Sequence, residues 1–245
     1  MQKRNATCAV IGAGDFIGSA IARRFAAEGY TVFAGRRSAE KLEKLKKEIE
    51  AAGGTCVARG LDARKEDDVA AFLQEADAHA PLEVAIINPG ANVQFPLLET
   101  TERVFRKVWE MACYAGFLAG RESARLMLAR GKGTILFTGA TASVRGGAGY
   151  AAFSSAKAGL RNLAQAMARE LGPQNIHIAH LIIDAGVDTE FVRERIKARG
   201  GDPNTLPADT LMNPESVANA YWYLHSQSRD GWTFELDLRP YAERW

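Results

Sequence analysis

The feature that most constrains this chain is a regular alternation of short apolar runs with longer segments of helical periodicity. The apolar runs are rich in β-branched residues, which favour strands, and lie at residues 7–11, 31–34, 55–59, 84–88, 133–137, 177–183 and 233–236. Apolar residues recur every three or four positions, as in helices, over residues 17–28, 39–52, 66–79, 101–128, 150–171 and 214–225. Such alternation indicates parallel strands joined by right-handed crossovers, with helices on both faces of the sheet.

The sequence therefore predicts an α/β fold with one doubly wound domain over residues 1–245. No linker, low-complexity run or internal repeat interrupts the alternation. Residues 188–212 are the exception, because they are polar and contain Gly200, Gly201, Pro203 and Pro207. We expect residues 185–212 to form an insertion that acts as a substrate lid at the carboxyl ends of the strands.

Composition and charge give no support to several classes of partner. The formal net charge is +2 with acids and bases interspersed, so neither nucleic acid nor a membrane surface is expected. The three cysteines are far apart, and no Cys/His spacing indicates a metal site. The first apolar run is too short for a signal peptide, and no segment reaches the length of a membrane span. We expect a soluble cytoplasmic protein with reduced, buried thiols.

A glycine-rich loop joins the first predicted strand to the first predicted helix. Gly12, Gly14 and Gly18 enclose Asp15, Phe16 and Ile17 in the sequence GAGDFIG. Glycine permits a tight turn and lets the backbone approach a pyrophosphate, while the helix N-terminus offers free N–H groups and a positive dipole end. The loop therefore favours a dinucleotide site, although a glycine turn between a strand and a helix can also be purely structural.

Arg36 and Arg37 follow the second predicted strand, at the position that faces the adenosine ribose in doubly wound folds. An acid there accepts the ribose 2′-hydroxyl, whereas arginine favours a 2′-phosphate. The pair predicts NADP(H) in preference to NAD(H); two surface arginines are the alternative. Asp62, Asn88 and Gly90 follow the third and fourth strands, at the edge where ligands bind open α/β sheets.

Together these segments resemble the short-chain dehydrogenase/reductase family over nearly the whole chain. The glycine loop, Leu61-Asp-Ala63, Asn88-Pro-Gly90, the FTGATAS run at residues 137–143 and Lys157 occur in the family's order. The resemblance implies a single Rossmann-type domain with a seven-stranded, mostly parallel sheet and a nicotinamide dinucleotide as cofactor. It also implies a homodimer or homotetramer assembled through the fourth and fifth helices.

The resemblance further assigns cofactor contacts by position. It implies that Gly12, Gly14, Ile17 and Gly18 lie along the pyrophosphate, with Asp15 and Phe16 between them. At the adenosine end, it implies that Asp62 and Ala63 meet the adenine and that Asn88 and Gly90 meet the ribose. At the nicotinamide end, it implies that Lys157 holds the ribose and that the segment with Gly186, Val187 and Thr189 contacts the carboxamide.

Three of the family's four catalytic positions lack the usual group. Phe153 stands at the tyrosine position, Ala140 at the serine position and Ala112 at the helical asparagine position, so only Lys157 remains. Phe16 and Ala185 also replace a loop glycine and a proline of the family pattern. Substitute hydroxyls occur nearby at Tyr150, Thr138, Thr141 and Ser143, and Asp184 is the nearest acid. Tyr150, Phe153 and Lys157 share one helix face, with Tyr150 about 10 Å from Lys157 along the axis.

These departures leave more than one function open. One hypothesis is an NADP(H)-dependent oxidoreductase with a non-standard proton donor, acting on a small apolar carbonyl or alcohol compound. Its pocket would comprise residues 92–96, 143–150 and 185–212, where Val93, Phe95, Val144, Val187 and Phe191 favour an apolar ligand but could equally pack the lid. The alternative is a catalytically impaired homologue that binds NADP(H) as a sensor, scaffold or partner subunit. A third possibility is dehydration or isomerisation on the same frame.

Overall fold

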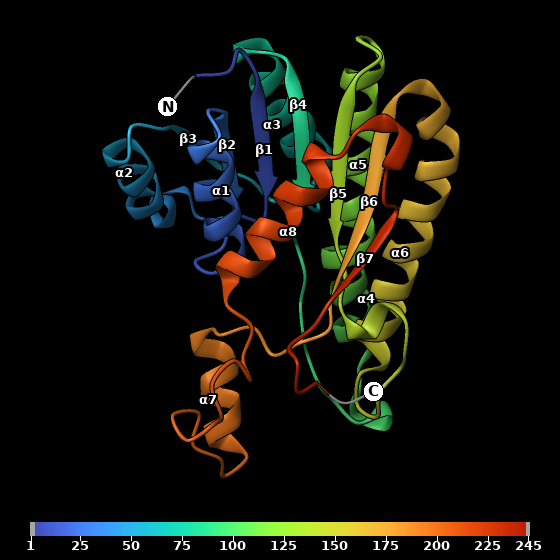
Figure 1. Cartoon of the computed structure of the whole chain (residues 1–245). Coiled ribbons are helices and arrows are strands. Elements are labelled where there is room, and N and C mark those ends of the chain that lie inside the picture. Colours follow the sequence, from blue (N-terminus) through green and yellow to red (C-terminus); the bar gives the residue numbers. More distant parts are fainter. Residues whose placement is uncertain (1–2, 244–245) are drawn as a thin grey trace.

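Seven parallel strands form one sheet in the order β3-β2-β1-β4-β5-β6-β7 (Figure 1). This computed structural model describes residues 3–243. The strands are β1 (Thr7–Ile11), β2 (Thr31–Arg36), β3 (Thr55–Gly60), β4 (Leu82–Ile87), β5 (Gly133–Thr138), β6 (Ile176–Ile183) and β7 (Glu235–Leu238). The predicted α/β fold with a seven-stranded parallel sheet is confirmed. The strand order reverses between β1 and β4, where doubly wound folds bind their ligands.

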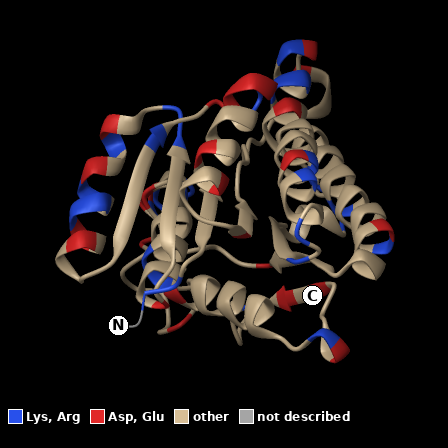
Figure 2. Cartoon of the chain, turned by 90° about the horizontal axis from the view of Figure 1, so that it is seen from above, with Lys and Arg blue, Asp and Glu red and all other residues tan. Residues whose placement is uncertain are grey.

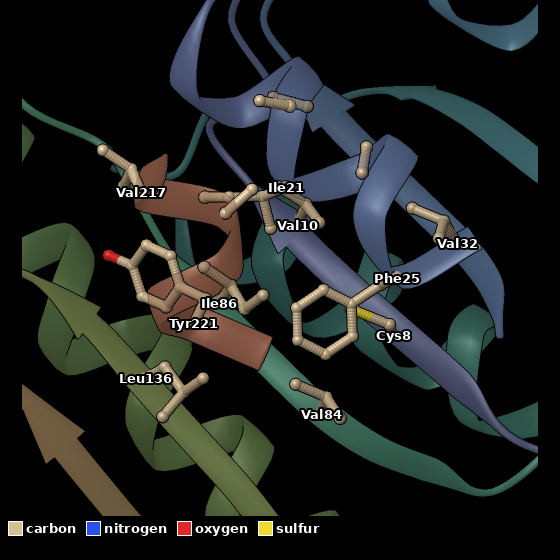
Figure 3. Packing of buried hydrophobic residues seen from close by; sticks show 14 of the residues in the cluster. Cys8, Val10, Ile21, Phe25, Val32, Val84, Ile86, Leu136, Val217 and Tyr221 are labelled. Carbon is tan, nitrogen blue, oxygen red and sulfur yellow. The ribbon is translucent and has the colours of Figure 1, made fainter. Parts of the chain in front are cut away.

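Helices cover both faces of the sheet because successive strand residues point to opposite sides. Cys8 and Val10 of β1 pack in one core, whereas Ala9 and Ile11 pack in the other. The first core lies under α1 (Ile17–Ala27), α2 (Glu43–Ala51) and α8 (Pro214–Ser226). Figure 3 shows Phe25 of α1 and Tyr221 of α8 in this core, together with Val10 and Ile86 of the sheet. The second core lies under α3 (Glu66–His79), α5 (Ala115–Leu128) and α6 (Ala151–Leu171).

Charged residues lie mainly along the helices, and the strands are free of them over most of their length (Figure 2). The burial of both sheet faces explains why the strand sequences are almost continuously apolar. Among residues 3–243, no helix is long and apolar enough to cross a membrane.

Several boundaries differ from the sequence prediction. The last strand begins at residue 235 rather than 233, because the Thr233 backbone N–H and side chain are both hydrogen-bonded to the Gln227 amide. Residues 39–42 form a tight 3-10 turn before α2. The long helix expected at 101–128 contains a π-helical turn, Glu110–Tyr114, between α4 (Glu102–Trp109) and α5. Apolar periodicity alone does not distinguish such a turn from a continuous helix.

The segment after β6 leaves the sheet and carries α7 (Glu190–Ala198), which projects beyond the carboxyl ends of the strands (Figure 1). Val187 and Met212 pair as an isolated parallel bridge, so the two ends of the segment are joined at its base. None of the residues of α7 is buried. This shape is compatible with the lid predicted at residues 185–212, which remains a prediction.

Two histidines, the buried His180 and the partly buried His225, are hydrogen-bonded inside the protein. The ring of His225 is hydrogen-bonded to Tyr30 Oη (2.8 Å) and Thr134 Oγ1 (3.0 Å). The ring of His180 is fully buried and is hydrogen-bonded to Glu235 (3.0 Å). Burial penalises the charged imidazolium and lowers the pKa of each histidine to about 4.

These pKa values predict acid destabilisation. A histidine in the unfolded chain titrates near pH 6.5. Between about pH 6.5 and pH 4 the unfolded chain therefore binds protons that the folded protein does not. The free energy of unfolding consequently decreases as the pH is lowered through this range. Urea titrations of wild type and His225→Gln across this range should show a shallower fall in the variant, by on the order of 1 kcal/mol per pH unit. An identical fall in both proteins would contradict the assignment of a neutral His225.

Candidate active site

A groove of about 540 Å³ opens at the carboxyl ends of β1 to β4. It is lined by residues that follow four different strands: Gly12, Gly14, Arg36, Arg37, Ser38, Lys41, Leu61, Asp62, Ala63, Asn88, Pro89, Gly90 and Met111. Half of the cofactor residues predicted from sequence therefore line one groove, namely Gly12, Gly14, Arg36, Arg37, Asp62, Ala63, Asn88 and Gly90. The strand-end positions explain this, because parallel strands all present their carboxyl ends at the same edge.

The loop glycines shape the groove in distinct ways. Gly12 has a φ of +86°, and a Cβ there would lie 2.9 Å from the backbone nitrogen of Pro89. A Cβ on Gly18 would lie 2.6 Å from the Gly12 carbonyl oxygen, so this glycine allows α1 to approach the loop. A Cβ on Gly14 would meet nothing within 4 Å, which leaves the groove open at that point. The loop thus presents backbone, rather than side chains, to a ligand.

Asn88 ties the loop to the neighbouring strand ends. Its side-chain amide donates to the Gly12 carbonyl oxygen (2.9 Å) and accepts from Thr138 Oγ1 (3.0 Å). Thr138 Oγ1 also forms a 2.6 Å hydrogen bond with Tyr221 Oη. The hydroxyl of Thr138, one of the candidates from sequence, is therefore occupied by structural hydrogen bonds.

The groove is basic at the end near β2 and β3. Arg36, Arg37 and Lys41 line it there, together with the Ser38 hydroxyl. Arg36 forms an ion pair with Asp15 of the glycine loop, with 2.6 Å between Nη1 and Oδ1. Asp62 is instead paired with Arg64 at 2.7 Å. This end has the donors that an anionic group requires.

Lys157 is buried at the far end of the groove. Only 4% of the residue is exposed, and its ammonium group donates to the Thr138 carbonyl oxygen at 2.7 Å. A Cβ on Gly90, which lines the groove, would lie 3.5 Å from Lys157 Nζ. Burial disfavours the charged form and lowers the pKa of Lys157 to about 8. The ammonium group therefore lies next to the groove, and among residues 3–243 it is hydrogen-bonded to the Thr138 carbonyl oxygen.

A separate cavity of about 330 Å³ lies along the N-terminal part of α6. Its wall is mostly apolar and consists of Asn92, Ala140, Thr141, Ala142, Arg145, Gly146, Gly147, Tyr150, Phe153, Ser154, Ile183 and Ala185. Phe153 packs in a small cluster with Ala112 and Ala156, and Ala140 packs against this cluster. The three catalytic positions that depart from the family pattern thus lie in one apolar cluster, and two of them, Ala140 and Phe153, line the cavity.

The substitute hydroxyls have different surroundings. Thr141 lines the cavity, but its hydroxyl donates to the buried carboxylate of Asp184. Ser143 is 4% exposed, does not line the cavity, and its oxygen accepts from the Ala140 backbone N–H at 3.1 Å. Tyr150 precedes α6, lines the cavity and accepts a hydrogen bond from Arg195 of α7.

Other predicted contacts lie elsewhere. Phe16 and Thr189 line a third cavity, between the glycine loop and α7. The Thr189 side chain caps α7 by accepting from the Val192 N–H. Gly186 faces the lid side, and Val187 is taken up by its bridge to Met212. The structure thus does not bring these four residues into the groove that contains Gly12 and Gly90.

The predicted substrate pocket overlaps the 330 Å³ cavity in part, because Asn92, Arg145, Gly146, Gly147, Tyr150 and Ala185 fall within its ranges, and it remains a prediction. Phe95, Val144 and Phe191 are 40%, 51% and 55% exposed and do not line the 330 Å³ cavity. Arg145 and Ser154 do line it. The Ser154 oxygen is buried and has no hydrogen-bond partner among residues 3–243. Arg145 falls within the predicted range 143–150, whereas no sequence signal singles out Ser154, because its direction depends on how α6 packs.

Comparison with known proteins agrees with this geometry. A model of the family described as short chain dehydrogenase matches residues 6–200. The chain belongs to the short-chain dehydrogenase family. A crystal structure of a short-chain dehydrogenase from Rhodopseudomonas palustris is 63% identical, covering 97% of this chain and 100% of that one, with a TM-score of 0.84. The sequence-based resemblance is therefore confirmed.

Two more distant members carry names that indicate chemistry. Cis-4-hydroxycyclohexanecarboxylate dehydrogenase of Sinomonas cyclohexanicum is 31% identical over 89% of this chain and 88% of its own. An alcohol dehydrogenase of Thermococcus sibiricus, solved with 5-hydroxy-NADP, is 27% identical over 98% of both chains, with a TM-score of 0.84. Their activities belong to those proteins.

The buried carboxylate of Asp184 allows a prediction about the stability of this short-chain dehydrogenase. Asp184 is 3% exposed, and Arg145 and Arg239 approach its carboxylate to 3.4 and 3.6 Å. Asp184→Ala removes the buried acceptor that the Thr141 hydroxyl and two guanidiniums share, and should lower the free energy of unfolding by ~3 kcal/mol. Asp188→Ala, which breaks the exposed pair with Arg193, is the matched control and should cost less than ~1 kcal/mol. Equal costs in chemical denaturation would show that Asp184 does not anchor the strand end.

Proposed function

We propose that this short-chain dehydrogenase is an NADP(H)-dependent oxidoreductase that acts on a small, largely apolar carbonyl or alcohol compound. The main observation in support of this proposal is the position of Lys157 between the groove and the apolar cavity. Its ammonium group lies against Gly90 of the groove, while Phe153, one helical turn earlier, lines the apolar cavity. A ligand in the groove and a ligand in the cavity would therefore meet beside the same buried lysine.

The residues of the groove fit a nicotinamide dinucleotide. The open space at Gly14 and the exposed loop backbone suit a pyrophosphate, and Arg36, Arg37, Ser38 and Lys41 suit a 2′-phosphate. Bound there, the dinucleotide would supply or accept the hydride. Lys157 would donate hydrogen bonds to the nicotinamide ribose hydroxyls, in addition to the Thr138 carbonyl. The NADP-type ligand of the T. sibiricus structure is consistent with this assignment.

We assign proton donation to Tyr150. Reduction of a carbonyl group requires a proton at the substrate oxygen, and a positioned acid contributes on the order of 10²–10⁴-fold to the rate. Of the hydroxyls predicted from sequence, Tyr150 lines the cavity without being committed to a carboxylate or a backbone N–H. Its oxygen accepts from the guanidinium of Arg195, which stabilises the phenolate left after proton transfer. Oxidation would reverse the transfer, with Tyr150 accepting the proton.

The second candidate is a protein that binds NADP(H) without dehydrogenase activity, as a sensor, scaffold or partner subunit. The apolar cluster that contains Ala112, Ala140 and Phe153 favours this second candidate, because no acid stands at the family's usual position.

For either candidate function we expect the protein to form a homo-oligomer through α5 and α6. The adjoining helical stretch exposes Trp109 and Phe117, which stack on either side of Tyr114.

Cofactor preference can be tested at Arg36. Arg36→Ala removes a cation suited to a 2′-phosphate, so it should weaken NADPH binding by about 10-fold or more and NADH binding far less. Fluorescence titration of the bound nicotinamide measures both. Arg23→Ala, which removes a surface arginine paired with Glu48, is the control and should change neither. Equal losses for NADPH and NADH would reject the 2′-phosphate assignment.

The proton donor can be tested at Tyr150. Tyr150→Phe keeps the ring but removes the hydroxyl, so kcat for carbonyl reduction should fall about 10²-fold or more. The double variant Ala140→Ser/Phe153→Tyr, which restores the family's groups, should retain or raise activity. Unchanged kcat in Tyr150→Phe would exclude this tyrosine. No turnover by wild type across a broad carbonyl and alcohol panel, with intact NADPH binding, would favour the second candidate.

A further inference from the structure

A further cavity, of about 430 Å³, lies between α7 and the body of the protein. It shares Asn92, Thr141, Arg145, Tyr150 and Ala185 with the apolar cavity, so the two are continuous. Three arginines line it, namely Arg145, Arg195 and Arg199. Two acidic residues line it as well, Glu243 and the Asp184 that is paired with Arg145, so a substrate in the apolar cavity would extend toward a wall in which arginines outnumber carboxylates.

Two of these arginines differ from the other cations of the site in their partners. Arg195 and Arg199 both donate to one neutral acceptor, Oε1 of Gln94, at 2.6 and 2.8 Å. Arg195 also donates to Tyr150 Oη, and its guanidinium carbon lies 5.5 Å from the centre of that ring. By contrast, Arg145 is paired with Asp184 and the neighbouring lid residue Arg193 with Asp188. Within residues 3–243, no carboxylate lies within 4 Å of Arg195 or Arg199.

In this arrangement two positively charged guanidinium groups, those of Arg195 and Arg199, share one neutral acceptor. Like charges four residues apart on a helix repel each other, and here both guanidinium groups share the oxygen of one amide. The negative end of the helix dipole offsets part of the repulsion, because Arg195 and Arg199 lie in and just after the last turn of α7. A carboxylate or phosphate would accept from both guanidiniums in charge-assisted, bidentate hydrogen bonds, which are about twice as strong as neutral ones. An oxyanion can therefore displace Gln94 as the acceptor.

We propose that Arg195 and Arg199 bind an oxyanion carried by the substrate, a carboxylate or a phosphate ester, at the end remote from the reacting carbon. This inference rests on the proposed function, because it places the reacting group beside Tyr150 and Phe153. Tyr150 lines both cavities and contacts Arg195, so it marks the junction of the two parts of the substrate. The substrate is then a hydroxy or oxo compound with an apolar middle and an anionic end.

The experiment compares matched pairs of probes on the NADPH-loaded protein. One pair is 4-oxocyclohexanecarboxylate and its methyl ester; the other is hydroxyacetone phosphate and hydroxyacetone. Calorimetry measures binding, and steady-state kinetics measures KM and kcat where turnover occurs. Wild type should bind the charged member of one pair at least 10-fold more tightly than the neutral member. Which pair shows the preference distinguishes carboxylate from phosphate.

The variant is Arg199→Gln, because this side chain contacts Gln94 without contacting the proposed proton donor. It should remove the preference for the charged probe and raise the KM of that probe more than the KM of the neutral one. Lys197→Gln, which removes an exposed cation of the same helix, is the control and should preserve the preference.

Three outcomes would overturn the inference: no preference in wild type for either pair, an equal effect of Arg199→Gln on charged and neutral probes, or an equal effect of Lys197→Gln. An equal effect on both probes would mean that the arginines only hold α7 against the residue 94 loop. Tight, Arg199-dependent binding of the charged probe without turnover would support the anion site while rejecting the oxidoreductase function.

Discussion

The close approach of Gly12 to the chain segment after β4 is the constraint on which the site depends. The backbone of Pro89 leaves no room for a Cβ at Gly12, and Asn88 hydrogen-bonds the Gly12 carbonyl. Asn88 in turn accepts from Thr138 at the end of β5, and the Thr138 carbonyl accepts from Lys157 of α6. One chain of hydrogen bonds therefore runs across the sheet from the glycine loop to the buried lysine. Any shift at the switch point between β1 and β4 would displace Lys157 as well.

This network also explains how cofactor binding and proton donation can be separate in this family member. The groove and Lys157 are positioned by backbone contacts and by Asn88, and none of these involves residues 140 or 153. Phe153 and Ala140 pack in an apolar cluster beside that frame and leave it intact. The protein can thus keep a dinucleotide site while the cavity next to it takes another proton donor, supplied in our proposal by the residue that precedes α6.

The segment predicted to form a lid is attached to the body in a different way. The bridge between Val187 and Met212 fixes its base, while α7 itself buries none of its residues in the core. Its contacts with the body are polar, through Arg195 and Arg199 to Gln94 and Tyr150.

Local patterns in the sequence determined the α/β class and the succession of strands and helices along the chain. They also identified the glycine loop and the basic residues at the end of β2. They are readable because apolar periodicity and glycine turns depend on neighbouring residues. Periodicity did not reveal the π-helical turn at Glu110–Tyr114, and it placed the last strand two residues early. Only the tertiary structure decided which hydroxyls and charges face the cavities. Arg195 meets Gln94 from 101 positions away, and Asp184 takes the Thr141 hydroxyl from 43 positions away. Such contacts depend on how helices and loops pack over the sheet, which no local pattern specifies.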